Sequence, residues 1–158
     1  MFRKMRRFKQ QISNEECIEV LKNAKRGVLS VMGEDGYPYG LPISHWYNEE
    51  DGKIYFHGAK TGHKLDAIKA CDKVSFCVMD EGYREEGDWA LNIKSVIAFG
   101  RAKLLEDRER VFEVCGMLTR KFTDDPEYLE KELRINGDRV QVVEITVEHM
   151  TGKLVNES

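Results

Sequence analysis

The order of apolar and polar positions predicts a helix near the start of the chain. Ser13 is followed three residues later by Glu16, the signature of a capping box, in which each side chain bonds the other residue's backbone N–H. Apolar residues then recur close to helical spacing over 17–24. We therefore expect a helix over residues 14–25, followed by Gly27 in the left-handed conformation that ends many helices.

Short apolar runs separated by acidic turns follow this helix, and they predict antiparallel strands. The expected strands cover residues 27–32, 37–47 and 53–57, and the turns between them end at Gly36 and Gly52. Because proline cannot donate a hydrogen bond to a sheet, Pro38 and Pro42 indicate an edge strand, a bulge or a binding face.

The second half of the chain continues with mixed elements. The pattern predicts a helix of about two turns after Lys64, a strand over 74–79, a charged loop over 80–93, a strand over 95–105, a helix over 107–122, a short helix opening at Asp124-Asp125-Pro126, and a strand over 141–147. Consecutive hairpins without regular strand–helix–strand alternation favour an antiparallel sheet or barrel. We expect one α+β domain over residues 1–158, mainly antiparallel β and barrel-like.

Composition limits the classes of partner. The 158 residues are one domain by length, and 25 basic against 28 acidic residues give a net charge of −3. That balance argues against a DNA-coating protein or a polybasic membrane binder. No stretch approaches the roughly 20 apolar residues of a membrane helix. The basic segment at residues 3–7 is not followed by the apolar core of a signal peptide. We therefore expect a cytoplasmic protein with no nucleic-acid or membrane partner.

The four cysteines are scattered without C-x-x-C spacing. In a reducing compartment they are expected to be free thiols, small and partly buried. A zinc site made of Cys and His needs clustered pairs of ligands, so we expect no metal site.

The segment from His57 to Lys64 (HGAKTGHK) has the composition of an anion-binding turn. Its glycines allow a tight turn and a close approach to a ligand, while Thr61, His63 and Lys64 supply donors. The helix start that follows offers free N–H groups. Phosphate binding is one interpretation, and an ordinary solvated loop is the other, because the order of residues in a P-loop is absent.

A second segment, Pro42-Ile43-Ser44, interrupts an apolar strand. A proline here leaves ladder groups unpaired that could meet the polar edge of a flat heterocycle. The alternative is a bulged edge strand in which Trp46 and Tyr47 belong to the core. No Ser-His-Asp or Cys-His set and no carboxylate pair is apparent, so an enzyme of this sequence would depend on a bound cofactor.

Six motifs occur in order along the chain, and together they resemble the nitroimidazole-resistance (Nim) branch of the pyridoxamine 5′-phosphate oxidase-like flavoproteins. The motifs are MFRKMRR at 1–7, DGYPY at 35–39, KIYFHGAKTGHK at 53–64, LDAI at 65–68, SVIAFGR at 95–101 and EHMTGK at 148–153. The region 80–93 shows little of the Nim pattern, so the resemblance is weakest there.

The resemblance implies an FMN-binding split β-barrel with flanking helices, working as a homodimer with flavin sites at the subunit interface. It implies an FMN-dependent oxidoreductase that delivers electrons to a small acceptor such as a nitroaromatic compound, with NAD(P)H as a candidate donor. The arginines and histidine with which the oxidase itself binds pyridoxal phosphate have no counterpart here, so we do not expect that activity.

The resemblance also implies roles for particular residues. The stretch Gly58, Ala59, Thr61, Gly62, His63 and Lys64 would hold FMN and its phosphate, with Lys64 as the main contact. Pro42, Ile43 and Ser44 would line the isoalloxazine ring through backbone groups. His57 would lie near the cofactor as the substrate-side, catalytic residue. Ser95 would reach the flavin of the facing subunit.

A different class of function remains open on the same barrel. Some split barrels bind haem, and His45, His57 or His63 could then serve as an axial ligand in a non-enzymatic carrier or sensor of flavin or haem. Otherwise His45 and His149 are expected to be surface or hydrogen-bonded strand residues.

Overall fold

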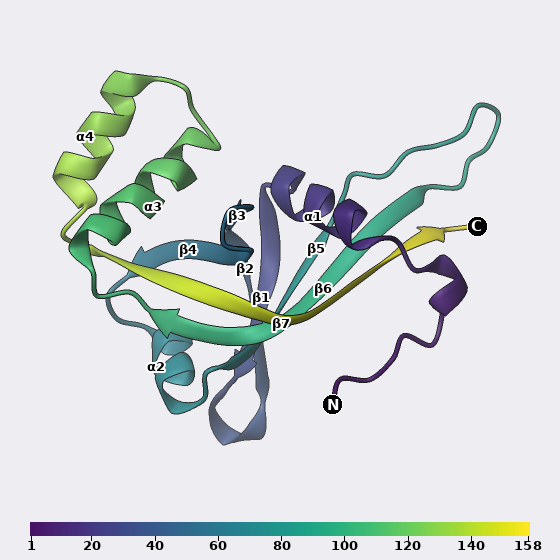
Figure 1. The fold of residues 1–158 in the computed structure, drawn as a ribbon, viewed down its shortest axis with the longest axis horizontal. Coiled ribbons are helices and arrows are strands. Elements are labelled where there is room, and N and C mark those ends of the chain that lie inside the picture. The colour runs from purple at the N-terminus through teal and green to yellow at the C-terminus, as the bar shows by residue number, and fades with distance from the viewer.

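The computed structural model describes all residues from 1 to 158. One seven-stranded antiparallel sheet, in the order β2-β1-β5-β6-β7-β4-β3, curls into a half barrel with four α-helices around it (Figure 1). This confirms the expected α+β split-barrel fold. The strands are β1 (Arg26–Met32), β2 (Pro38–Ser44), β3 (Trp46–Asn48), β4 (Lys53–Ala59), β5 (Lys73–Met79), β6 (Asn92–Leu104) and β7 (Val140–Asn156). The helices are α1 (Asn14–Asn23), α2 (His63–Ala70), α3 (Arg108–Arg120) and α4 (Pro126–Asn136).

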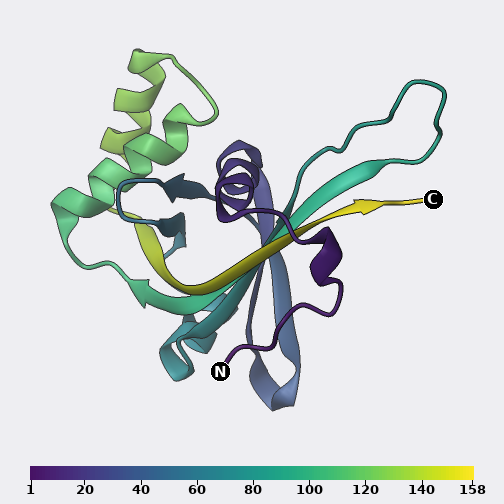
Figure 2. The ribbon, with the colours of Figure 1, turned by 45° about the vertical axis from the view of Figure 1, so that its right-hand side comes forward.

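The long strands β6 and β7 pair with each other in the middle of the sheet, and β7 bends along its length (Figure 2). Their register shifts at Phe99/Gly100, where a Cβ on Gly100 would lie 2.2 Å from the carbonyl oxygen of Thr146. The expected strand over 141–147 is therefore too short. The residues from His149 onward pair with the first half of β6, so the strand continues to Asn156.

The expected strand over 37–47 is two strands. β2 ends at Ser44 and β3 begins at Trp46, and the chain changes direction at His45 to pair with β4 instead of β1. β2 is an edge strand, as Pro42 indicated, because only β1 pairs with it. Tyr47 is buried and Trp46 half-buried, as in the alternative in which both belong to the core.

Helix α1 begins with the predicted capping box. The Glu16 N–H donates to Ser13 Oγ at 3.1 Å, and the Ser13 N–H donates to Glu16 Oε2 at 3.0 Å. The prediction for Gly27 is wrong: it lies in β1, and a Cβ there would meet the Phe76 ring at 2.5 Å. This glycine serves close packing and not a helix end.

The apolar residues form two clusters on opposite sides of the strands. The larger cluster fills the half barrel beneath α1 and α2, around Leu29, Phe56 and Phe76. The smaller one joins α3 to β4 and β7 through Tyr55 and Val114. None of the helices has the length and hydropathy needed to cross a bilayer, and all four cysteines are free, as expected.

Candidate functional site

The start of α2 leaves backbone N–H groups without a partner in the helix. Gly62 precedes the helix with φ 143°, a conformation that glycine adopts easily, and it has no side chain to cap the helix. The first backbone bond of α2 runs from Asp66 N–H to the Gly62 oxygen at 3.1 Å. The N–H groups of His63, Lys64 and Leu65 therefore have no partner within the helix.

The Lys64 side chain lies across the end of β4. A Cβ on Gly58 would come within 3.0 Å of Lys64 Nζ, so the absence of a side chain at Gly58 leaves room for the amine. Lys64 is half-buried and forms no ion pair. An uncompensated ammonium beside free N–H groups suits a phosphate.

His63 has a different environment from Lys64. Its ring stacks on Tyr39 of β2, with ring centroids 4.1 Å apart and planes inclined by 18°. The stack joins the beginning of α2 to the edge strand. Thr61 is exposed in the preceding turn, and Ala59 is exposed at the end of β4.

The second predicted segment lines a groove of about 680 Å³. Pro42, Ile43 and Ser44 of β2 form part of it, and His57 of β4 joins them. β2 and β4 are not neighbours in the sheet, so it is the curling of the sheet that brings these residues together. His57 and Gly58 are adjacent in β4, which connects the groove to the Lys64 turn.

The opposite wall of the groove comes from α3, α4 and the turn between them, which the sequence analysis did not include in the site. Its apolar members are Leu118 and Phe122, and its polar members are Thr119, Thr123, Asp125, Tyr128 and Glu132. Figure 1 shows the α3–α4 hairpin standing beside β4 at one end of the molecule. In the sequence, the aromatic residues Phe122 and Tyr128 on either side of the Asp124-Asp125-Pro126 turn could have indicated this wall. Both are exposed in the structure.

His57 sits between charges of opposite sign. The surrounding protein displaces water from its ring, and this desolvation lowers its pKa. The negative charge of Glu132 raises the pKa of His57, and the positive charge of Lys64 lowers it further. A small cavity of about 40 Å³ is also lined by His57, Thr119 and Glu132, together with Cys115. The imidazole is thus positioned to exchange a proton with a molecule in the groove.

Ser95 does not line the groove. It lies in β6, paired with Met79 of β5 on one side and Lys153 of β7 on the other. Within one chain the structure therefore separates Ser95 from the other predicted site residues.

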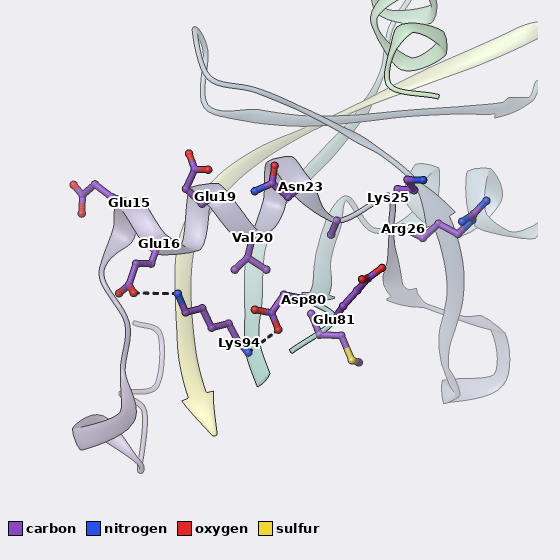
Figure 3. Close-up of a pocket in the computed structure, with 12 residues that line it drawn as sticks. Glu15, Glu16, Glu19, Val20, Asn23, Lys25, Arg26, Asp80, Glu81 and Lys94 are labelled. Carbon is purple, nitrogen blue, oxygen red and sulfur yellow. Dashed lines mark hydrogen bonds and ion pairs between the residues drawn. The ribbon is translucent and has the colours of Figure 1, made fainter. Parts of the chain in front are cut away.

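A second cavity, of about 850 Å³, lies between α1 and the adjoining ends of β5 and β6. Figure 3 shows Glu15, Glu16 and Glu19 along the helix, with Asp80, Glu81 and Lys94 facing them. Lys94 is already bonded to Glu16 at 3.3 Å. Lys25 and Arg26 also line this cavity, but its five carboxylates outnumber its three cations, and none of the predicted site residues lines it.

His45 is fully buried, so it is not a surface residue, but it is hydrogen-bonded, as the other expectation had it, at the junction of β2 and β3. One ring nitrogen, Nε2, lies 2.8 Å from the carbonyl oxygen of Leu21, and the ring packs edge-on against Phe76. Burial lowers its pKa to about 4, with a further contribution from Lys121. A residue enclosed in this way is not accessible to a haem.

Comparison with known proteins assigns a family. The family model described as pyridoxamine 5′-phosphate oxidase matches residues 13–154. No curated protein matches the chain.

Solved structures share the fold at low sequence identity. A candidate 5-nitroimidazole antibiotic resistance protein from Bacteroides thetaiotaomicron is 18% identical, with a TM-score of 0.75 over 92% of this chain and 87% of that one. A FAD-binding protein from Mesorhizobium loti is 24% identical, with a TM-score of 0.66 over 92% and 97%. The flavocytochrome Anf3 from Azotobacter vinelandii is 17% identical, with a TM-score of 0.70 over 96% and 72%.

Proposed function

Because this chain belongs to the pyridoxamine 5′-phosphate oxidase family, we propose that it is an FMN-dependent oxidoreductase that delivers electrons to a small acceptor. The observation that carries this proposal is the separation of charge along the site. The Lys64 amine lies beside Gly58 near the end of β4, close to the free N–H groups at the start of α2 in the chain, and the groove with its carboxylates is lined by the preceding residue, His57. A nucleotide with an anionic tail and a neutral ring would bind with its tail at Lys64 and its ring in the groove.

The residues present fit this cofactor. Thr61, Gly62, His63 and Lys64 would bind the phosphate, and Gly58 and Ala59 would form the backbone beneath it. Pro42, Ile43 and Ser44 would line the ring. Since β2 has a partner strand on one side only, its outer edge leaves backbone N–H and C=O groups free to bond the ring. A groove of about 680 Å³ is within the usual size of a cofactor site.

FMN, when bound, supplies the redox chemistry, with NAD(P)H as the proposed donor. His57 is the catalytic candidate, because it lines the groove and its imidazole has an N–H in either protonation state with which to hydrogen-bond the acceptor. Leu118 and Phe122 of the helical wall add apolar surface to the same space.

A nitroaromatic compound is the acceptor class we favour. The similar Bacteroides protein is described as a 5-nitroimidazole antibiotic resistance protein. Nitroimidazole rings are flat and uncharged. Oxidation of a phosphorylated pyridoxine is not proposed, because no lysine or arginine lines the groove to bind a second phosphate.

A homodimer is proposed from the outer face of the sheet. Val28, Cys77 and Ile97 pair in one row across β1, β5 and β6, and Val28 and Ile97 are exposed. Phe99 is also exposed, two residues further along β6. Ser95 belongs to the same face of β6 as Ile97, so a second copy packed here would bring its own groove towards Ser95.

Haem binding is the alternative, since Anf3 is a flavocytochrome. Of the three candidate axial ligands, His45 is buried in the core and His63 is stacked on Tyr39. Only His57 would then be available, and it lines the groove that we propose for flavin.

The absorption spectrum of the purified protein tests the proposal. We expect a yellow protein with flavin bands, which NAD(P)H bleaches without oxygen and which a nitroaromatic compound restores. A Soret band in place of flavin bands would establish the haem alternative. Flavin that is bleached but not restored by any acceptor would indicate a carrier instead of a reductase.

A further inference from the structure

The wall that α3 and α4 place over the groove carries negative charge without a compensating cation. Asp125 and Glu132 line the groove, and neither forms an ion pair. Asp125 Oδ1 accepts the N–H groups of Glu127 and Tyr128 at 3.0 and 3.3 Å. Asp125 thus caps α4, and its side chain lies at the positive end of the helix dipole.

Glu132 is half-buried on the same wall, where its Oε2 accepts a hydrogen bond from Asn136 Nδ2 at 2.8 Å. Its negative charge raises the pKa of His57 against the effect of desolvation. The two carboxylates therefore belong to two places on one wall, one at the start of α4 and one two turns later.

The cations near this wall are engaged elsewhere. Lys121 Nζ donates to the carbonyl oxygens of Ala24 and His45, both at 2.6 Å, and does not line the groove. The Arg26 guanidinium lies over the Phe122 ring of this wall, 5.9 Å from its centre, but it lines the neighbouring acidic cavity and not the groove. Inside the groove, His57 is the single residue that can carry positive charge.

We infer that this wall selects the acceptor by charge: among aromatic acceptors, the groove binds neutral and cationic molecules more tightly than anionic ones. The inference rests on the proposed function and specifies its substrate class. Tyr128 and Phe122 supply aromatic surface for a flat ring, while Asp125 and Glu132 attract a cation and repel a carboxylate or phosphate. The same field would keep the anionic tail of the cofactor at the Lys64 end.

Three nitroaromatic probes of similar size and different charge test the inference: 4-nitrobenzylamine, 4-nitrobenzyl alcohol and 4-nitrobenzoate. Binding to the oxidised, FMN-loaded protein is measured from the change in flavin absorbance, and reduction rates are measured separately. We expect the cation to bind about ten times more tightly than the anion, with the alcohol between them. Raised salt should narrow this preference, because charges at an open groove are screened.

Glu132→Gln is the main variant, and it should narrow the ratio of cation to anion affinity by about three- to tenfold. Asp125→Asn is the second variant, because asparagine preserves the helix cap. Glu130→Gln is the matched control, since it removes the same charge from the same helix at an exposed position outside the groove. Equal affinities for the three probes, or the same narrowing in Glu130→Gln, would overturn the inference.

Equilibrium dialysis with FMN separates this result from the proposed function. A protein that binds FMN but shows no preference by charge contradicts only the inference about the wall. A protein that binds no FMN contradicts the proposed function, and calorimetric titration of the three probes onto that protein then decides the charge preference of the groove directly.

Discussion

Lys64 is the residue on which the proposed cofactor site depends most. Lys64→Ala removes an ammonium that has no other partner in the chain, so we expect FMN binding to weaken by about 1–3 kcal/mol, or 5- to 150-fold in Kd. Titration of the apoprotein with FMN measures the change.

Lys60→Ala is the control for this substitution. Lys60 is an exposed lysine of the same turn, four residues earlier, and it does not lie beside Gly58. An equal loss of affinity in both variants would mean that general positive charge, and not a specific contact of Lys64, attracts the cofactor.

The buried His45 should make the stability of the fold depend on pH. Its pKa is about 4 in the folded chain and 6.5 when exposed, so between these values the unfolded state binds the extra proton. The contribution of His45 to stability is therefore complete above pH 6.5. It falls by up to about 1.4 kcal/mol per pH unit as the pH drops towards 4.

Urea unfolding of the wild type and His45→Gln, followed by tryptophan fluorescence, measures this contribution. Glutamine can still donate to the Leu21 carbonyl but does not titrate. The wild type should be the more stable protein at pH 7, and its advantage should shrink by pH 4.5. An advantage that stays constant over this range would show that His45 does not carry the effect.

At the scale of elements, one lysine joins the end of α3 to the rest of the fold. Lys121 Nζ bonds the carbonyl oxygen of Ala24 after α1 and that of His45 between β2 and β3. Desolvation lowers its pKa to about 8. Thr119 and Phe122, on either side of it in the chain, line the groove, so this contact fixes the helical wall.

Lys121→Met should lower the free energy of unfolding by about 1–3 kcal/mol, because it leaves two carbonyl groups without their donor. Hydrogen exchange should rise in the last turn of α3. Arg120→Met is the matched control, since Arg120 is exposed and its side chain contacts only Met117 Sδ at 3.7 Å. The proposed contact fails if both substitutions destabilise the protein equally.

The whole molecule presents an apolar sheet face that a second copy could cover. Ile97→Lys would place a charge in the middle of the row formed by Val28, Cys77 and Ile97, so we expect it to convert the proposed dimer to a monomer. Light scattering after gel filtration measures the mass. Ile135→Lys is the control, because Ile135 is equally exposed but lies on α4.

FMN affinity measured on the same samples tests the shared site. If Ser95 of a second copy completes the flavin site, the monomeric variant should also bind FMN more weakly. A wild-type monomer that binds FMN tightly would contradict the shared site, and a dimer that survives Ile97→Lys would contradict this choice of interface.

The sequence alone determined the features that depend on neighbouring residues. The capping box at Ser13, the turns at Gly36 and Gly52, and the proline at position 42 on an edge strand all follow from local chemistry, which acts over a few residues. Local chemistry also identified the free helix start at Lys64. Local chemistry did not predict the role of Gly27, because the Phe76 ring that occupies the space beside Gly27 is distant in the chain.

Only the tertiary structure decided how these parts meet. The curling of the sheet joins Pro42 to His57, places α3 and α4 over both, buries His45 and leaves Ser95 outside the groove. Each of these results depends on pairings between residues far apart in the chain, such as β4 with β7 and β6 with β7. The pattern of apolar positions specifies which face of a strand is buried, but it does not specify which distant strand or helix covers it.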